Sequence, residues 1–435
     1  MRGTAADGNG AMGADLIIEN AAEIVTCAPR AGGDDPGVLT GASLVIEQGR
    51  IAHLGPARSV AAELAATGRT PASFPRLDAA GKAVLPGFID AHTHLVFAGD
   101  RVDEFSRRLA GEGYLEILRG GGGILSTVRA TRCASREELL RLGRKRLDAM
   151  LAHGVTTVEA KSGYGLDRDT EIRQLEVACE LGRLHPVEVV STFLGAHAVP
   201  EEYRGRPSAY IDFLIHEVLP EVAARGLARF CDVFCETGVF PPAEARRLLR
   251  AAADLGLGLK IHADEMSPLG GAELAAELGA VSADHLLHVS PAGIAALARA
   301  GVVAVLLPMT AFSLREPYAP ARAILEAGGT VALATDFNPG SCYSESIPLL
   351  SALGAVALGL SAEEIVAALT IHAAAALGIA GTVGSLEVGK QGDLVVLDAP
   401  SYRHLPYRLG VNLVETVVKR GKIVCDQRNP GGTAC

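Results

Sequence analysis

The sequence has no excess of positive charge and no shortage of apolar residues. Its 40 Lys and Arg residues stand against 50 Asp and Glu residues, which gives a formal net charge of −10. An acidic chain has no general affinity for polyanions, so we expect neither nucleic acid nor a membrane surface as a partner. Because 49% of the residues are hydrophobic and only 21% are charged, disorder is excluded for most of the length.

Cysteine is sparse, and its distribution excludes a disulfide scaffold. The eight cysteines are scattered over 435 residues and form no CxxC pair. Small secreted domains carry dense cysteine frameworks, so this pattern favours a reducing compartment. The first 20 residues contain one Arg and no apolar segment of the length that a secretory signal needs. We therefore expect a cytoplasmic protein.

Long hydrophobic runs are also missing. The most apolar stretch, residues 347–362, is shorter than the ~20 residues of a membrane-spanning helix, and it ends at Glu363 and Glu364. This length and these flanking charges predict a buried helix instead.

Short β-rich runs occur near both ends of the chain. Residues 15–26, 42–55 and 81–88 have this character, and similar runs return at 390–400 and 414–424. Neither group is large enough to bury a core alone, which predicts one small β-sandwich domain built from both ends. We expect this composite domain at 14–84 and 384–425, with flexible tails at 1–13 and 426–435.

The middle of the chain, 85–383, has a different pattern, in which apolar runs alternate with helical segments. The eight runs are residues 85–94, 155–162, 187–197, 228–236, 257–265, 280–288, 301–308 and 330–338. Apolar residues recur every three or four positions in 135–154, 170–184 and 242–256, which predicts helices there. Eight βα units favour an α/β fold with a closed (β/α)₈ TIM-like barrel.

A doubly wound open sheet is the alternative fold. It lacks support, because no GxGxxG motif follows the first run, and Gly120–Gly123 does not have that spacing.

Potential metal ligands stand where several of these runs end. His92 and His94 are two residues apart, so their side chains point to the same side of a strand. His262 ends the fifth run and Asp336 ends the eighth. Three imidazoles and a carboxylate at the catalytic face of a barrel predict a site for a divalent transition metal such as zinc or iron.

Other polar residues gather at the same ends. Hydrolysis needs groups that take a proton from water and give one to the departing nitrogen, and Glu265, His285 and Asp336 are the candidates. Glu265 has an alternative role as a carboxylate at a helix start, and His285 as a hydrogen-bonding residue. Tyr164 follows the second run, and His197 ends the third.

Arginines and a turn segment complete the candidates. Arg101 could clamp a substrate carboxylate, whereas Arg107 fits a solvated or ion-paired role better. Asn338, Gly340 and Ser341 have turn-forming composition, so backbone groups there could approach a ligand or form a plain turn. Lys161 could be carboxylated to bridge two metals, but a salt-bridged lysine is commoner, and we expect one metal.

Longer stretches around these residues resemble the amidohydrolase superfamily and, within it, the imidazolonepropionase family. The stretches are PGFIDAHTHLVFAGDR, EFSRRLAGEGYLEILRGGGGI, TFLGAHAVP, KIHADE, SADHLLH and LATDFNPGS. The resemblance covers about residues 15 to 425. Its HxH motif is common to the superfamily, whereas the extended first stretch, EFSRRLAGEGYLEILRGGGGI and the DFNPGS ending are specific to the narrower family.

The resemblance implies a metal-dependent hydrolase of histidine degradation. Its reaction would be the ring opening of 4-imidazolone-5-propanoate to N-formimidoyl-L-glutamate. One Zn²⁺ or Fe³⁺ would be held by His92, His94, His262 and Asp336. The implied substrate-binding residues are Arg101, Tyr164, His197, Glu265, Asn338, Gly340 and Ser341. Family members carry either Glu or Gln at the position of Glu265.

Two other functions stay open. Another amidohydrolase, such as a guanine or aminoazole deaminase, can use a similar ligand set but would release ammonia. A catalytically silent scaffold would act through protein contacts, although all four expected ligands are present. A homodimer is expected from the family and from the frequency of twofold homo-oligomers.

Overall fold

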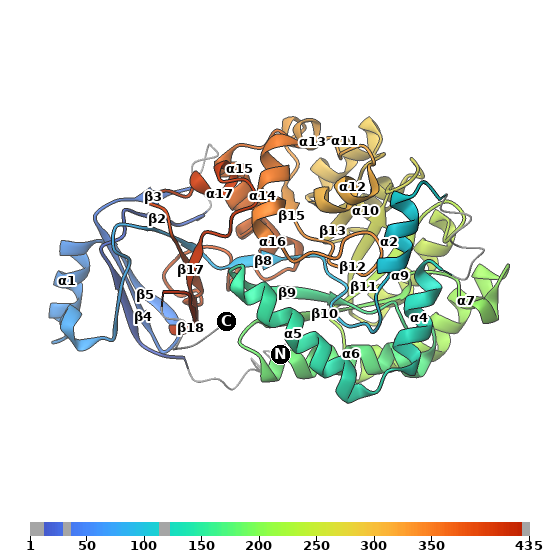
Figure 1. Ribbon diagram of the computed structural model, residues 1–435, viewed down its shortest axis with the longest axis horizontal. Coiled ribbons are helices and arrows are strands. Elements are labelled where there is room, and N and C mark those ends of the chain that lie inside the picture. The colour runs from blue at the N-terminus through green and yellow to red at the C-terminus, as the bar shows by residue number, and fades with distance from the viewer. Residues whose placement is uncertain (1–12, 29–35, 113–121, 429–435) are drawn as a thin grey trace.

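The computed structural model describes residues 13–28, 36–112 and 122–428. The chain forms a barrel surrounded by helices and a smaller β body beside it (Figure 1). The expected fold class, a (β/α)₈ barrel with a sheet domain from both chain ends, is confirmed. Part of the stretch EFSRRLAGEGYLEILRGGGGI, residues 113–121, lies outside the described residues.

The barrel consists of eight parallel strands in the order β15-β14-β13-β12-β11-β10-β9-β8. Their bounds are β8 Phe88–Asp90, β9 Val155–Lys161, β10 Glu188–Ala196, β11 Phe230–Cys235, β12 Gly258–Ala263, β13 Ser282–His285, β14 Val303–Leu306 and β15 Val331–Leu333. Each expected run contains one of these strands.

The two ends of the strand order meet just beyond β8 and β15. The backbone N–H of Asp336 donates to the carbonyl of His92 at 3.0 Å, and the N–H of His94 donates to the carbonyl of Phe337 at 2.9 Å. Thr93 forms an isolated parallel bridge with Phe337. These contacts close the barrel and bring three of the expected metal ligands together: His92, His94 and Asp336.

Helices cover the outside of the barrel (Figure 1). The three helices predicted from periodicity are α5 Arg136–Ala152, α6 Arg168–Leu184 and α9 Pro242–Asp254. The others in the barrel half are α2 Val102–Leu109, α4 Ile124–Cys133, α7 Pro207–Phe213, α8 Leu219–Ala224, α10 Gly271–Leu278, α11 Pro291–Ala300, α12 Pro308–Leu314, α13 Ala321–Glu326, α14 Ile347–Val356, α15 Ala362–Ala368, α16 Ile371–Ala376 and α17 His404–Tyr407.

The expected helix over 347–362 is shorter than predicted. Helix α14 ends at Val356, Gly359 adopts φ 67°, and the Ser361 hydroxyl then caps the separate helix α15. The apolar stretch is therefore divided by a turn that glycine makes accessible. Within the described residues, we find no helix whose length and apolar character would let it cross a membrane.

The smaller body consists of two packed sheets. One has the order β5-β4-β1-β6 and the other β18-β17-β16-β7-β2-β3. Their bounds are β1 Leu16–Glu19, β2 Glu23–Val25, β3 Val38–Leu39, β4 Ala42–Glu47, β5 Arg50–Pro56, β6 Arg76–Asp78, β7 Ala83–Pro86, β16 Leu394–Leu397, β17 Val414–Lys419 and β18 Lys422–Asp426, with helix α1 Ala57–Ala66 at one side.

Strands from the two chain ends share one core in this body. Ile18 and Leu44 from the first sheet pack with Val84, Val396 and Val418 from the second. In Figure 1 the blue strands of the chain start lie against the red strands of the chain end. The expected boundary at 84/85 falls within β7, and the expected tails lie largely outside the described residues.

The barrel interior is charged where a hydrophobic core would be expected. Side chains alternate along a strand, so one residue in two points inward. On β9, β11, β12 and β13 the inward positions near the catalytic end carry Glu159, Lys161, Asp232, Lys260 and Asp284, all fully buried. These residues form the floor beneath the candidate metal site.

Candidate metal centre

Three buried imidazoles converge at the mouth of the barrel. His92 and His94 follow β8, and His262 lies near the end of β12. The ring centroids of His92 and His262 are 4.6 Å apart, and those of His94 and His262 are 5.7 Å apart. One nitrogen from each of the three rings lies within 4.8 Å of the others. This is a spacing that a single cation can bridge.

Asp336 supplies a carboxylate to the same point. Its Oδ1 lies 3.5 Å from Nε2 of His92 and 3.5 Å from Nε2 of His94. Its Oδ2 accepts a 2.6 Å hydrogen bond from the Thr310 hydroxyl, so Oδ1 remains directed at the imidazoles. Asp336 adopts φ 51°, a left-handed conformation that costs energy in most residues, and the barrel-closing hydrogen bond to His92 holds it there.

The free valences of these side chains fit a transition metal. Within the described part of the chain, Nε2 of His92 and Nε2 of His262 are buried and have no hydrogen-bond partner. A buried polar nitrogen without a partner is costly, and a bound cation would satisfy it. Three imidazole nitrogens and one carboxylate oxygen are donors that zinc and iron both accept.

Two carboxylates orient the imidazoles from behind. Asp284 Oδ2 lies 2.7 Å from Nδ1 of His92, and Asp232 Oδ2 lies 3.1 Å from Nδ1 of His262. A carboxylate at Nδ1 fixes the tautomer that leaves Nε2 free for a metal, and it makes the imidazole a better ligand.

Lys161 joins these two carboxylates. Its Nζ lies 2.7 Å from Asp232, 2.9 Å from Glu159 and 3.4 Å from Asp284. Lys260 completes the group with a 3.0 Å contact to Glu159. Lys161 is therefore salt-bridged. The barrel floor contains three carboxyl groups and two amino groups, which lie within ion-pair distance of one another.

Burial and these charges set the protonation states of the centre. Burial lowers the pKa of His92 well below its usual value, and the charge of Lys161 lowers it further. Burial also disfavours the charged form of His262, but the Asp232 carboxylate outweighs it and raises the pKa of His262. The pKa of Asp232 is held well below its usual range because His262 and Lys161 outweigh its burial.

Glu265 and His285 lie on the open side of the centre. The Oε2 atom of Glu265 is 3.4 Å from Nε2 of His285, and the His285 ring is 5.1 Å from that of His262. Burial, together with the nearby Asp336, raises the pKa of Glu265 to about 8. Burial lowers the pKa of His285 to about 3. At neutral pH this geometry pairs a protonated carboxyl with a neutral imidazole.

Tyr164 and His197 form one wall of the site. The His197 ring stacks on His94 with centroids 4.9 Å apart, and the Tyr164 ring lies 5.7 Å from His94. The Glu171 carboxylate holds the loop that carries Tyr164, because it accepts hydrogen bonds from the backbone N–H groups of Gly163, Gly165 and Leu166. Tyr164 is thus fixed beside the imidazoles by a buried carboxylate on α6.

Asn338, Gly340 and Ser341 form a tight turn after β15. Asn338 Oδ1 accepts hydrogen bonds from the backbone N–H groups of Gly340 and Ser341, both at 2.8 Å. Its Nδ2 donates to the Asp336 carbonyl and to the Ser341 hydroxyl. The Asn338 side chain is therefore occupied in shaping the turn that carries Asp336.

The two candidate arginines on and before α2 have different surroundings. Arg101 lies against Gly340, and a Cβ built on Gly340 would come within 1.4 Å of an Arg101 Nη atom. A side chain at position 340 would therefore displace this guanidinium from its place. Arg107 donates from Nε to Glu112 at 2.6 Å, which is the ion-paired role expected for it.

The sequence matches a known protein family over most of its length. The family model described as the amidohydrolase family matches residues 83–424, which is most of the chain. The chain belongs to the amidohydrolase family.

This amidohydrolase is similar in sequence to proteins named imidazolonepropionase. It is 53% identical to the one from Clostridium tetani over 415 residues, which are 94% of this chain and 98% of that protein. It is 58% identical to the one from Bacteroides fragilis over 352 residues, which are 80% of this chain and 84% of that protein.

Solved structures share its fold at lower identity. An adenosine deaminase from Xanthomonas campestris with bound zinc superimposes with a TM-score of 0.66 at 22% identity, over 95% of this chain and 94% of that one. A triazine hydrolase from Arthrobacter aurescens superimposes with a TM-score of 0.69 at 19% identity, over 96% of each chain.

The residues that orient the ligands of this amidohydrolase were not predicted from its sequence. Asp232 and Asp284 stand in the apolar runs FCDVFC and SADH, and a charged residue at an inward position of a buried strand is the signal that would have found them. Glu171 gave no comparable signal, because a carboxylate in the first turn of a helix is ordinary.

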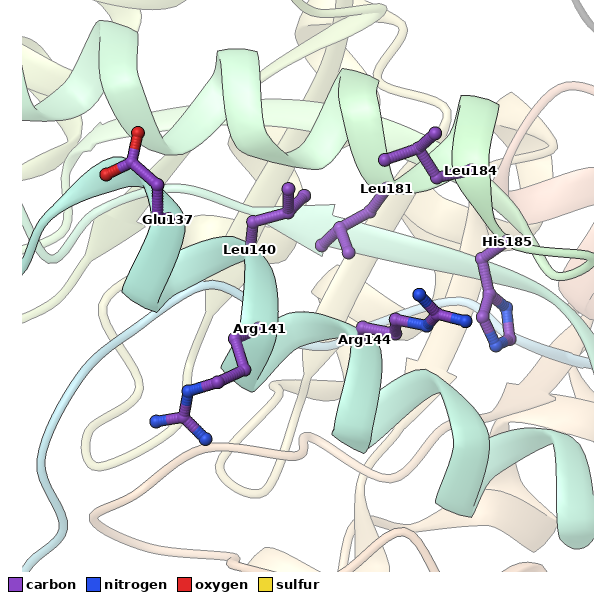
Figure 2. A pocket seen from close by; sticks show the side chains of 7 residues that line it. All are labelled: Glu137, Leu140, Arg141, Arg144, Leu181, Leu184 and His185. Atoms are coloured by element: carbon purple, nitrogen blue, oxygen red, sulfur yellow. The ribbon is translucent and has the colours of Figure 1, made fainter.

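A separate pocket of about 260 Å³ lies between α5 and α6, outside the barrel. Figure 2 shows Leu140 and Arg144 of α5 facing Leu181 of α6, with His185 at one end. None of the expected ligand or substrate residues of the amidohydrolase lines it. This pocket is therefore distinct from the metal centre.

Proposed function

We propose that this amidohydrolase opens the five-membered ring of 4-imidazolone-5-propanoate with water to give N-formimidoyl-L-glutamate, a step of histidine degradation. The observation that carries the proposal is 53% identity to the Clostridium tetani imidazolonepropionase across 94% of this chain and 98% of that protein. The convergent imidazoles and carboxylate at the barrel mouth supply the hydrolytic centre that the reaction requires.

One cation, Zn²⁺ or Fe³⁺, would be held by His92, His94, His262 and Asp336. When bound, it supplies Lewis-acid polarisation and lowers the pKa of water. The chain prepares for this through Asp284, whose hydrogen bond at Nδ1 keeps His92 in the ligating tautomer, and through Asp232, which lies 3.1 Å from Nδ1 of His262.

Residues around the centre would orient the substrate. Arg101 carries a permanent positive charge and suits the propionate carboxylate. His197 and Tyr164 line the wall beside His94 and can hydrogen-bond the ring amide. The tight turn of Asn338, Gly340 and Ser341 lies against Arg101 and would contact the same end of the substrate.

Proton movements would use Glu265, His285 and Asp336. The reaction adds the oxygen and one hydrogen of water to the ring carbonyl carbon, breaks the bond from that carbon to nitrogen, and places the other hydrogen on the nitrogen. Because its pKa of about 8 keeps Glu265 protonated at neutral pH, its carboxyl is suited to deliver that proton. The Asp336 carboxylate is suited to accept the proton that water loses. The neutral His285 imidazole, 3.4 Å from Glu265, is a weak base because of its pKa of about 3, and it is suited to orient the Glu265 carboxyl.

The scattered cysteines and the small substrate favour a cytoplasmic enzyme, and a twofold homodimer is the expected assembly. The substrate requires no nucleic acid or membrane partner.

Turnover of freshly generated 4-imidazolone-5-propanoate tests the proposal. We expect metal-loaded protein to remove the ultraviolet absorbance of the substrate, to give a product with the mass of N-formimidoyl-L-glutamate, and to release no ammonia. His262→Ala should lose metal and turnover together. His53→Ala, which removes a histidine from β5 of the small sheet body, serves as the matched control. Ammonia release without ring opening would instead establish a deaminase.

A further inference from the structure

Two arginine side chains of the α2 segment meet at one glycine of the opposite loop. Arg101 stands at the N-terminal cap of α2, and Arg108 lies two turns further along the same face. An Nη atom of Arg108 donates to the Gly340 carbonyl at 3.2 Å. The Arg101 guanidinium occupies the space that a side chain at position 340 would fill.

Neither guanidinium contacts a carboxylate of the described residues, although the Glu104 charge partly offsets that of Arg108. Among the described residues, Arg101 and Arg108 form no ion pair, and the buried Nε of Arg101 has no hydrogen-bond partner. Glu104 lies on the same helix, but its carboxylate accepts from the N–H of Gly123 and the hydroxyl of Ser126. Burial lowers the pKa of Arg108, and the positive charge of Arg101 lowers it further, as expected for two like charges held together.

The neighbouring arginines differ in this respect. Arg107 is paired with Glu112. Arg146 is buried, donates to the carbonyls of Leu95 at 2.7 Å and Phe97 at 2.9 Å, and stacks on the Phe97 ring at 3.5 Å. Arg107 is thus ion-paired and Arg146 is fixed by two carbonyls and a ring, whereas Arg101 and Arg108 lie together at Gly340.

This charge lies next to the wall of the metal centre. Arg101 is close enough to Tyr164 that its charge opposes the rise in the Tyr164 pKa caused by burial. The Tyr164 ring is 5.7 Å from that of His94. Gly340 follows Asp336 by four residues, on the turn that Asn338 shapes. Both arginines therefore lie at the turn that follows Asp336, on the side of the centre that carries Tyr164.

We propose that Arg108 acts with Arg101 as a substrate-binding residue that recognises the carboxylate at the end of a short aliphatic arm. Two guanidiniums can donate to both carboxylate oxygens, and the anion relieves the repulsion between them. This inference rests on the proposed function and assigns Arg108 to the arm of that substrate. It makes α2 a determinant of specificity for an acid over its uncharged analogues.

Equilibrium binding of two stable probes tests the assignment. The probes are imidazole-4-propionate and its amide, measured by calorimetry on the metal-loaded full chain. Arg108→Gln should weaken binding of the acid by about 10- to 100-fold, the loss expected for a hydrogen bond to a charged group, and should change binding of the amide by less than about 2-fold. Arg108→Lys should fall between the wild type and Arg108→Gln, because it keeps the charge but loses the planar fork.

Arg107→Gln is the matched control, since it removes an adjacent positive charge that is already paired with Glu112. Equal loss of acid and amide binding in Arg108→Gln, or unchanged acid binding, would overturn the assignment. Failure of the assignment is separable from failure of the function: wild-type turnover with an unchanged KM in Arg108→Gln refutes only the role of Arg108. A metal-loaded wild type that cannot open the ring of 4-imidazolone-5-propanoate refutes the proposed function.

Discussion

The contact between Asp284 and His92 gives a sharp prediction about metal affinity. Asp284→Asn keeps the volume of the side chain but replaces the carboxylate that lies 2.7 Å from Nδ1 of His92 with a neutral amide. An amide holds the imidazole less firmly than a carboxylate does. Loss of such an orienting partner costs about 10- to 100-fold in metal affinity, which is about 1.4 to 2.8 kcal/mol.

The barrel floor allows the charge effect to be separated from the contact. Asp284 and Glu159 are both fully buried acceptors for Lys161, so either amide variant removes one negative charge from the same group of three carboxylates and two ammonium groups. Of Asp284 and Glu159, Asp284 is the one that also hydrogen-bonds a predicted ligand, His92. Glu159→Gln should therefore weaken the metal less than Asp284→Asn does.

Competition with a chelator of known affinity measures both dissociation constants, and the thermal midpoint of each variant checks that it folds. We expect a clear order, with the wild type tightest, Glu159→Gln intermediate and Asp284→Asn weakest. Equal dissociation constants for the two variants would refute the reasoning, because the contact with His92 would then contribute nothing beyond its charge.

Two further predictions concern stability. The pKa of Glu265 is about 8 in the folded, metal-free chain against 4.5 for an ordinary Glu, so the unfolded state loses its proton first as the pH rises. The free energy of unfolding, measured with denaturant, should therefore fall from about pH 5 to pH 8. Glu265→Gln should flatten this slope, and an unchanged slope would exclude Glu265 as its source. At Gly163, with φ 101°, a Cβ would lie 2.8 Å from the Leu194 carbonyl and 2.9 Å from His197, so Gly163→Ala should lower the free energy of unfolding by about 1–3 kcal/mol. The control Gly68→Ala, at φ 74° with open space around it, should cost less, and equal losses would contradict the steric explanation.

The barrel could be predicted because its signals are local. Each strand is a short apolar run, and each helix of the α5 and α6 type shows apolar residues every three or four positions. Residues 347–362 were predicted as one helix because nearly all of them are apolar. The boundary between α14 and α15 is marked instead by Gly359 and Ser361, which favour a turn and a helix start.

The candidate site was predictable to the extent that its residues stand at strand ends. His92, His94, His262 and Asp336 were found in this way, and the structure brings them to one point. The carboxylates that contact these ligands come from other strands, and the sequence does not state which strands face one another in the barrel. Asp284 reaches His92 across the barrel axis, a contact between residues 192 positions apart.

The shared core of the two chain ends sets an order of events during synthesis. Strand β7 needs β16, its antiparallel partner, which leaves the ribosome roughly 300 residues later. At about 5–20 residues per second, this delay is about 15–60 s. Throughout it the edge of β7 and the apolar side chains of the first sheet wait without their partners, while all eight barrel strands are completed at Leu333. A nascent chain that stalls before β16 therefore exposes an open, apolar sheet to its surroundings. The last strands to be made bury this apolar surface when they pair.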